Sequence, residues 1–278
     1  YQMQSECDGV HDGSPYKQVN PMQHYENTAS PRGSRVDGFN PEYGAPTLPT
    51  LETLREVMDE KDLWPINKEV WDYHDGGGFH LMSTMYKDLV NNSKTIWEVW
   101  NYNKLDYGDR YCSGLLFWYH NCPVRQVCAR MWDWSLEPTA SLYHTQNALE
   151  PLHAQFDYLK NTVSVCNDYY QSFKNYKVKA DVYDLNSKKV FSYSQRIDIG
   201  EDEVLNDLFK IDFPSDITPV HFIRLGLSDE KGKEIASTFY WRSNAAYEGK
   251  ETLTGPTSSG FESLNDMPAA RLQTKYKT

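Results

Sequence analysis

The sequence predicts a multidomain chain in which an α/β part with parallel strands is followed by an all-β sandwich. Three observations predict this class. A strand-like run that begins near Val36 precedes an amphipathic helix, a continuously apolar strand covers residues 114–119, and short alternating runs fill residues 162–241. A strand followed by a helix is one βα unit, whereas closely spaced alternating runs are typical of antiparallel sheets.

Composition and charge exclude several classes of partner. The 278 residues carry 28 Lys and Arg against 39 Asp and Glu, which gives a formal net charge of -11. Nucleic acid and anionic membrane surfaces require a basic patch, so we expect neither as a partner. No apolar run approaches the ~20 residues of a membrane span, and the start at Tyr1 without a signal peptide indicates a processed or incompletely observed chain.

Aromatic residues are unusually frequent, at 14% of the chain with 8 Trp and 20 Tyr. Aromatic rings stack on the C–H faces of sugars while neighbouring polar groups bind hydroxyls, so the composition is compatible with a carbohydrate ligand. Ordinary core and edge packing is the alternative explanation.

The five cysteines contain no C-x-x-C pair, so we expect no zinc site and no metal. Cys112, Cys122 and Cys128 could approach one another around one strand and its loop. Buried free thiols are the preferred interpretation.

Glu42 is the candidate catalytic residue of the first part. Residues 1 to about 35 are predicted to form a long loop, and the strand-like run after them ends near Phe39. Pro41 cannot donate to a sheet ladder, and Gly and Pro residues follow it, so Glu42 is predicted to lie beyond the strand at its carboxyl end. In a (β/α)8 barrel such positions carry the chemistry. A solvated loop residue is the alternative.

The elements that follow are predicted from spacing. Thr50 can cap a helix in which Leu51, Leu54 and Met58 recur on one face. Continuous apolarity in residues 114–119 indicates a strand buried on both faces, as in a parallel sheet or barrel. A second helix is predicted from about Ser141 to Leu152.

Six strands are predicted after residue 161, and they indicate an antiparallel sandwich of immunoglobulin-like type. Polar and Gly-containing turns at residues 186–188 and 229–233 separate strand pairs into hairpins. The six ranges are 162–167, 176–185, 190–199, 208–213, 221–227 and 235–241.

Four ordered motifs resemble glycoside hydrolase family 2, in the branch of exo-β-D-glucosaminidases, mannosylglycoprotein endo-β-mannosidases and β-mannosidases. The motifs are Gly38-Phe39-Asn40-Pro41-Glu42-Tyr43-Gly44, Leu48-Pro49-Thr50-Leu51-Glu52-Thr53-Leu54-Arg55, Gly114-Leu115-Leu116-Phe117-Trp118-Tyr119-His120-Asn121 and Asn147-Ala148-Leu149-Glu150-Pro151-Leu152-His153. The resemblance covers most of the chain.

The resemblance implies a domain organisation. Residues 1–160 would be the C-terminal part of a TIM (β/α)8 barrel, with the strand of Glu42 as its seventh and the strand before Asn121 as its eighth. Residues 161–246 would be the immunoglobulin-like sandwich, and 247–278 a linker or the start of a further domain.

The resemblance also implies a retaining glycosidase with Glu42 as nucleophile and no cofactor, because two carboxyl groups suffice for this chemistry. Its substrate would be an oligosaccharide or glycan with β-linked mannose or glucosamine. The general acid/base would be a Glu that follows Asn, and no such pair in this chain fits. We therefore expect the N-terminal remainder of a larger enzyme to supply it, this chain alone to be inactive, and the enzyme to be extracytoplasmic, whether secreted, periplasmic or in a lysosome-like or vacuole-like compartment.

Further site residues carry over from the resemblance with alternatives. Trp118 would form the floor of the first sugar subsite or belong to the barrel core, and Asn121 beside it would bind a hydroxyl. His74 would hydrogen-bond a sugar or a backbone carbonyl. His11 and Tyr16 would line the pocket or anchor their loop.

The sequence departs from the family pattern in two places. Val124 stands where glucosaminidases carry a Trp, which leaves mannose and glucosamine both open. Residues 93–100 leave no room for an expected helix, so we expect residues to be missing there. A non-catalytic carbohydrate-binding module that uses Tyr169, Tyr170 and Tyr193 is the alternative function for the sandwich.

Overall fold

The computed structural model describes residues 40–43, 47–63, 67–74, 115–117, 120–127, 129–157 and 160–243, with 40–43 and 115–117 described by their backbone. These residues fall into two compact units, and the division lies between Leu149 and Glu150. Within the described ranges, no helix has the length and apolarity needed to cross a membrane.

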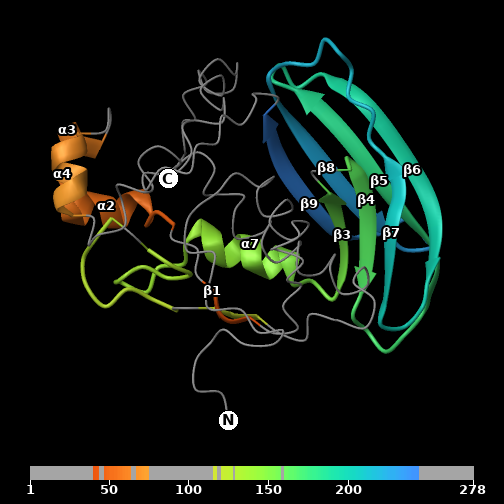
Figure 1. The fold of residues 1–278 in the computed structure, drawn as a ribbon, viewed down its shortest axis with the longest axis horizontal. Coiled ribbons are helices and arrows are strands. Elements are labelled where there is room, and N and C mark those ends of the chain that lie inside the picture. The colour runs from red at the N-terminus through yellow and green to blue at the C-terminus, as the bar shows by residue number, and fades with distance from the viewer. Residues whose placement is uncertain are drawn as a thin grey trace, which may run out of the picture. The chain divides into compact units, whose positions relative to one another are not determined.

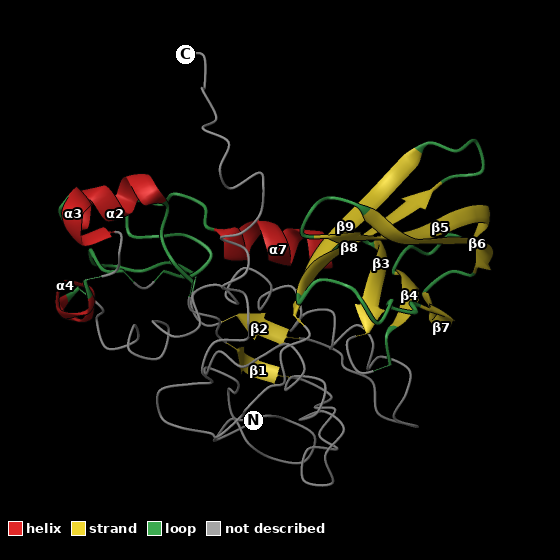
Figure 2. Cartoon of the chain, turned by 90° about the horizontal axis from the view of Figure 1, so that it is seen from above, coloured by secondary structure: helices red, strands yellow, loops and turns green. Residues whose placement is uncertain are grey.

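The first unit contains a short parallel sheet and several helices (Figure 1). Strand β1 lies beside β2, and the two strands run parallel, as expected from the sequence (Figure 2). The bounds are Asn40–Tyr43 for β1, Leu51–Val57 for α2, Glu60–Leu63 for α3, Lys68–Tyr73 for α4, Leu115–Phe117 for β2 and Ala140–Ala148 for α7.

Helix α2 begins as its sequence predicts. The Thr50 side chain accepts a hydrogen bond from the Thr53 amide at 3.3 Å, which satisfies one of the donors left free at a helix start. Leu54 and Met58 are buried, but Leu51 is exposed, so the buried stripe is narrower than predicted.

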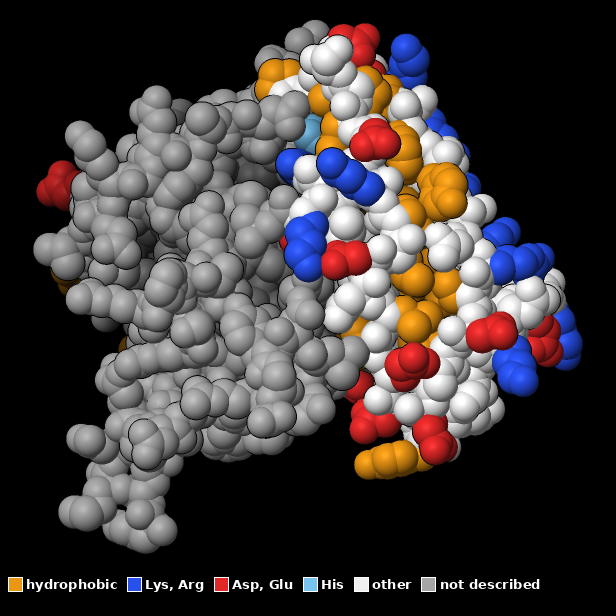
Figure 3. All heavy atoms as spheres, turned by 45° about the vertical axis from the view of Figure 1, so that its right-hand side comes forward, with side chains coloured by type: hydrophobic (Ala, Val, Ile, Leu, Met, Phe, Trp, Pro, Cys, Tyr) orange, Lys and Arg blue, Asp and Glu red, His pale blue; other side chains and the backbone are white. Residues whose placement is uncertain are grey.

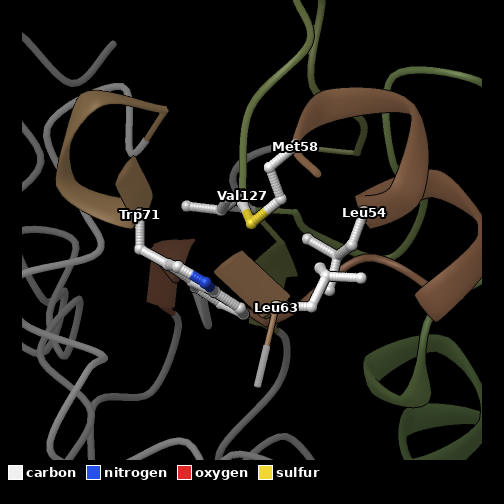
Figure 4. Packing of buried hydrophobic residues seen from close by; sticks show 5 residues of the cluster. All are labelled: Leu54, Met58, Leu63, Trp71 and Val127. Atoms are coloured by element: carbon white, nitrogen blue, oxygen red, sulfur yellow. The ribbon is translucent and has the colours of Figure 1, made fainter. Parts of the chain in front are cut away.

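A small apolar core holds the helices of this unit together (Figure 4). Leu54, Met58, Leu63, Trp71 and Val127 converge from α2, α3, α4 and the segment after β2. The Trp71 indole also donates to the Asp62 carbonyl at 2.8 Å, so its polar edge is satisfied while its rings are buried. Elements of modest length are thus stabilised by packing more than by their own propensity.

The second unit is an antiparallel β-sandwich of seven strands. One sheet has the order β3-β4-β7 and the other the order β6-β5-β8-β9 (Figure 1). The bounds are Leu152–Asp157 for β3, Thr162–Asn167 for β4, Phe173–Asp184 for β5, Lys189–Ile199 for β6, Glu203–Lys210 for β7, Val220–Ser228 for β8 and Glu234–Ser243 for β9.

The two sheets share one core. Val163 and Val165 of β4, and Ile223 and Leu225 of β8, are fully buried between them. A hydrogen bond of 3.0 Å from the Phe156 amide of β3 to the Tyr240 hydroxyl of β9 also links the sheets. Apolar residues of both sheets therefore form the core between them, as expected for a sandwich.

Both predicted hairpin turns are present. In the β5–β6 turn, Ser187 adopts a φ of 61° and donates to the Asp184 carbonyl at 3.0 Å. In the β8–β9 turn, Gly232 adopts a φ of 85° and donates to the Asp229 carbonyl at 3.0 Å. Positive φ at these positions explains the polar and Gly residues found there.

Two predictions about element limits were wrong. The second predicted helix, 141–152, ends at Ala148, and residues 152–157 form β3 because they pair with β4 along their whole length. The predicted strand 208–213 lies instead at 203–210. Its pairing with β4 is irregular, and Asp207 at a φ of 52° interrupts the alternation that periodicity detects.

Strand β3 also bears on the domain limit. We expected the sandwich to start at residue 161, whereas β3 pairs with β4 along its whole length, from Leu152 against Asn167 to Asp157 against Thr162. The second unit therefore begins at Glu150, with β3 as its first strand.

A histidine lies in the core of the sandwich, where burial and a neighbouring arginine disfavour its charge. His221 of β8 is fully buried, with its ring centroid 5.0 Å from that of Phe213. It pairs with Arg242 on β9 and with Asp184 on β5, and its Nδ1 lies 3.4 Å from the Thr218 carbonyl. Burial, reinforced by the positive charge of Arg242, lowers the pKa of His221 to about 4.

We expect this histidine to make the sandwich sensitive to acid. Because its folded pKa lies below the unfolded value of 6.5, its contribution is complete above pH 6.5 and is lost as pH falls toward 4, by about 3 kcal/mol in all. NMR titration of the ring signals, assigned with His221→Leu, should place its midpoint near pH 4. A midpoint near 6.5 would contradict the assignment of a neutral buried ring.

Candidate active site

Glu42 lies in a strand and not beyond it, which corrects the prediction. Strand β1 runs from Asn40 to Tyr43, and its parallel register pairs Asn40 with Leu115 and Tyr43 with Phe117. Three residue steps on β1 therefore face two steps on β2. The irregularity falls at Pro41 and Glu42, so the proline that cannot donate is accommodated without ending the strand.

The chain that leaves β1 is fixed by a backbone bridge. The Thr47 amide donates to the Ala129 carbonyl at 3.0 Å, and the Ala129 amide donates back to Thr47 at 2.7 Å. Thr47 and Ala129 are both buried. This exchange holds Thr47, three residues before the Thr50 cap of α2, against the segment that follows β2.

His74 lies at the C-terminus of α4. Its carbonyl accepts from the Val127 amide at 2.8 Å, and Val127 is also in the core with Trp71. The Tyr73 ring stands edge-on to the His74 ring, with centroids 5.0 Å apart. The backbone position of His74 is therefore fixed by the same segment that holds Thr47.

Asn121 is half-buried just after β2. It forms an isolated parallel bridge with Trp132, whose amide donates to the His120 carbonyl at 3.3 Å. The Trp132 and His120 rings are stacked, with centroids 4.1 Å apart and planes 25° apart. The segment from residue 120 to 139 thus folds back on itself beside Asn121.

A buried carboxylate holds this segment to α2. Asp133 has 1% of its surface exposed. Its Oδ1 accepts from the Ser135 amide at 2.9 Å, the Ser135 hydroxyl at 2.7 Å and the Glu137 amide at 3.0 Å. Its Oδ2 accepts from the Thr53 hydroxyl of α2 at 2.6 Å. Sequence reasoning missed Asp133, and the Asp-x-Ser pattern of an Asx turn was the available signal.

One segment, residues 120–139, contacts or contains three positions of interest. Its backbone bonds to Thr47, after the strand of Glu42, and to the carbonyl of His74. It also contains Asn121, which forms a bridge with Trp132. Trp118, His11 and Tyr16 lie outside the described residues, as do the predicted gap at 93–100 and the segment 247–278. The structure thus brings together backbone positions, and of Glu42 it describes the backbone.

Val124, the position at which the sequence departs from the glucosaminidase pattern, lies at the surface. Val124 is exposed, and the next residue, Arg125, places its guanidinium 4.3 Å from the ring centroid of Trp134. Arg125 also lies 4.0 Å from the Glu56 carboxylate on α2. A tryptophan is therefore present in this loop, although not at the position that the family pattern indicates.

Two of the five cysteines lie in the described region. Cys122 and Cys166 are buried and form no disulfide, as the preferred interpretation of the cysteines predicts for Cys122. Cys7, Cys112 and Cys128 lie outside the described residues. Among the residues that the structure describes, no group of three His, Cys, Asp or Glu side chains could hold a metal ion.

The tyrosines of the alternative interpretation differ in their surroundings. Tyr169 and Tyr170 lie in the turn after β4 and are exposed. Tyr193 on β6 is also exposed at one edge, but its ring packs on Phe209 of β7, with centroids 4.8 Å apart.

Comparison with known proteins bears on the resemblance. No family model matches the chain. An exo-β-D-glucosaminidase of Amycolatopsis orientalis is 22% identical over 265 residues, which cover 86% of this chain and 26% of that protein. A second exo-β-D-glucosaminidase, from Hypocrea jecorina, is 24% identical over 84% of this chain and 29% of its own length. This chain resembles part of an exo-β-D-glucosaminidase.

The predicted resemblance to this branch is confirmed by further relatives. A mannosylglycoprotein endo-β-mannosidase of Lilium longiflorum is 23% identical over 73% of this chain and 25% of its own length. The crystal structure of the Amycolatopsis orientalis exo-chitosanase has a TM-score of 0.76 at 21% identity and covers 93% of this chain and 34% of its own. A β-D-mannosidase from Dictyoglomus thermophilum has a TM-score of 0.60 at 17% identity, over 81% of this chain and 29% of its own.

These comparisons establish a shared fold and a partial match. The chain spans about a quarter to three tenths of the length of the curated relatives named above.

The Asp133 network predicts a graded loss of stability. Asp133→Ala leaves two amides and two hydroxyls without their acceptor and should lower the free energy of unfolding of the first unit by about 3 kcal/mol. Thr53→Val removes one of these donors and should cost about 1 kcal/mol. Urea denaturation followed by tryptophan fluorescence measures both values. Equal stability of Asp133→Ala and the unaltered chain would show that the network is dispensable.

Proposed function

We propose that this chain is the part of a retaining β-glycosidase that supplies the nucleophile, Glu42, for hydrolysis of β-linked glucosamine or mannose in oligosaccharides or glycans. The observation that carries the proposal is the parallel pairing of β1, the strand of Glu42, with β2. The sequence similarity to exo-β-D-glucosaminidases and to an endo-β-mannosidase supports it.

We infer further that β1 and β2 are the seventh and eighth strands of a (β/α)8 barrel. Parallel strands that neighbour each other in a barrel require a long connection, and 71 residues, 44–114, separate the two strands (114 − 44 + 1 = 71). The carboxyl ends of both strands then lie at the face where barrel enzymes carry their active sites. The sandwich that follows would be immunoglobulin-like, since seven strands in sheets of three and four are typical of that class.

The irregular pairing at Pro41 and Glu42 has a consequence for this mechanism. A bulge re-aims the side chain that it carries and is frequent next to active sites. In the proposed reaction the Glu42 carboxylate attacks the anomeric carbon as the glycosidic C–O bond breaks. A second carboxyl group, about 5–5.5 Å away, protonates the leaving oxygen and later takes a proton from the water that releases the sugar.

The second carboxyl group is proposed to come from the remainder of the enzyme. The chain spans only 26% and 29% of the length of two exo-β-D-glucosaminidases that it resembles, which supports this proposal. Trp118 would form the sugar floor, and Asn121 and His74 would bind hydroxyls from positions that residues 120–139 hold in place. His11 and Tyr16 would complete the pocket. No cofactor is required.

Replacing Glu42 tests the proposal. In the complete polypeptide that contains this chain, Glu42→Gln keeps the size of the side chain but removes its charge and nucleophilicity. Turnover of aryl β-glucosaminide and aryl β-mannoside should fall by at least ~10³-fold.

A matched control separates catalysis from charge and folding. Glu52 is an exposed carboxylate on α2 in the same unit, and Glu52→Gln should leave turnover within about twofold of the unaltered enzyme. If Glu42→Gln turns over both glycosides at the unaltered rate while folding normally, Glu42 is not the nucleophile.

A further inference from the structure

One end of the sandwich presents tyrosine side chains beside acidic ones. The β4–β5 turn, residues 168–172, and the β6–β7 turn, residues 200–202, lie together at the lower end of the sandwich in Figure 1. We call these two turns the tyrosine tip. Tyr170 has 88% of its surface exposed and Tyr169 46%. Such exposure of a large aromatic ring at a turn does not serve the core.

The tyrosine tip is held in place from inside by one buried amide. Asn167 is fully buried, and its Nδ2 donates to the Gln171 carbonyl at 2.8 Å and to the Gly200 carbonyl at 2.5 Å. Its Oδ1 accepts from the Tyr169 amide at 3.0 Å. The Asp202 amide in turn donates to the Tyr169 carbonyl at 3.0 Å. Both turns therefore have a fixed geometry before any ligand arrives, which lowers the entropy cost of binding.

The aromatic surface continues onto β5. The Tyr169 ring stands edge-on to Phe173, with centroids 5.9 Å apart, and Phe173 packs against Tyr176 at 5.1 Å. The Tyr169 ring thus packs against Phe173, whereas the Tyr170 ring is exposed to solvent. Exposed aromatic rings stack on the C–H faces of pyranoses.

Acidic side chains surround the tyrosines. Asp168 in the first turn and Glu201 and Asp202 in the second are exposed. Among the described residues, Glu201 and Asp202 form no ion pair with a Lys or Arg. Figure 3 shows acidic side chains gathered at the lower end of the described face, where a hydrophobic side chain projects. The tip thus combines exposed tyrosine rings with the negative charges of Glu201 and Asp202.

We propose that the tyrosine tip is an accessory binding site for a chain of β-linked glucosamine, whose free amines are cationic at neutral pH. The aromatic platform would stack on one pyranose while Glu201 and Asp202 attract the amines of that unit and its neighbours. Neutral sugars would gain the stacking alone. This proposal rests on the proposed function, in that it names the aminosugar as the substrate class held near the enzyme.

Binding by the full 278-residue chain tests the tip without requiring turnover. Isothermal titration with a glucosamine hexamer should show binding that weakens about tenfold in Tyr170→Ala and falls with added salt. The doubly altered Glu201→Gln, Asp202→Asn chain should lose the salt dependence. The N-acetylated hexamer, which lacks the positive charges, should bind at least ~10-fold more weakly than the free amine.

The control alters another exposed tyrosine, which lies outside the tyrosine tip. Tyr143 on α7 is 57% exposed, and Tyr143→Ala should bind the hexamer as the unaltered chain does. Unchanged binding in Tyr170→Ala, or equal binding of the acetylated and free hexamers, overturns the proposal. Because no turnover is measured, a failure of Glu42 as nucleophile would leave this result standing, and a failure here would leave the Glu42 test standing.

Discussion

The carboxylate of Asp133 is the interaction on which the first unit depends. A buried charge of this kind is costly unless its oxygens are hydrogen-bonded, and Asp133 accepts four hydrogen bonds from Thr53, Ser135 and Glu137. Residues 120–139 contain no helix or strand among their described positions before α7, so their backbone groups need partners from elsewhere. Asp133 joins to α2 the same segment whose backbone bonds to Thr47 and His74. The candidate site is therefore built on an irregular segment that one buried acid keeps in place.

In the sandwich, the buried residues lie in the strands, whereas Tyr169 and Tyr170 are exposed in a turn. Apolar residues of β4 and β8 are fully buried between the sheets, and the Phe156–Tyr240 hydrogen bond joins β3 to β9. Because the core needs no help from the turns, the turns at one end are free to carry exposed tyrosines and acids. Asn167 connects the core to the turns. It is the last residue of β4, and its buried side chain forms the hydrogen bonds that fix the tyrosine tip.

Sequence reasoning succeeded where the signal was local. The Thr50 cap, the two hairpin turns and five of the six predicted sandwich strands depend on neighbours within a few residues, and the structure contains them. It failed where distant partners decide. Strand β3 mixes His153, Gln155 and Asp157 with apolar residues, and its polar members are nevertheless buried. The irregular pairing at Glu42 depends on the neighbouring strand β2. The role of Asp133 depends on its hydrogen bond with Thr53, which is 80 residues away in sequence. No periodicity encodes such pairings.

The central claim is that Glu42 forms the covalent bond to sugar in a site completed by the rest of the enzyme. The most direct measurement is trapping of the complete polypeptide with an activated 2-deoxy-2-fluoro-β-glycoside, because the fluorine slows release of the glycosyl-enzyme more than its formation. Peptide mass spectrometry should then locate one glycosyl unit on the peptide that contains Glu42. Inactivation with the label on a different carboxylate, or turnover of the reagent without any label on Glu42, would contradict the account.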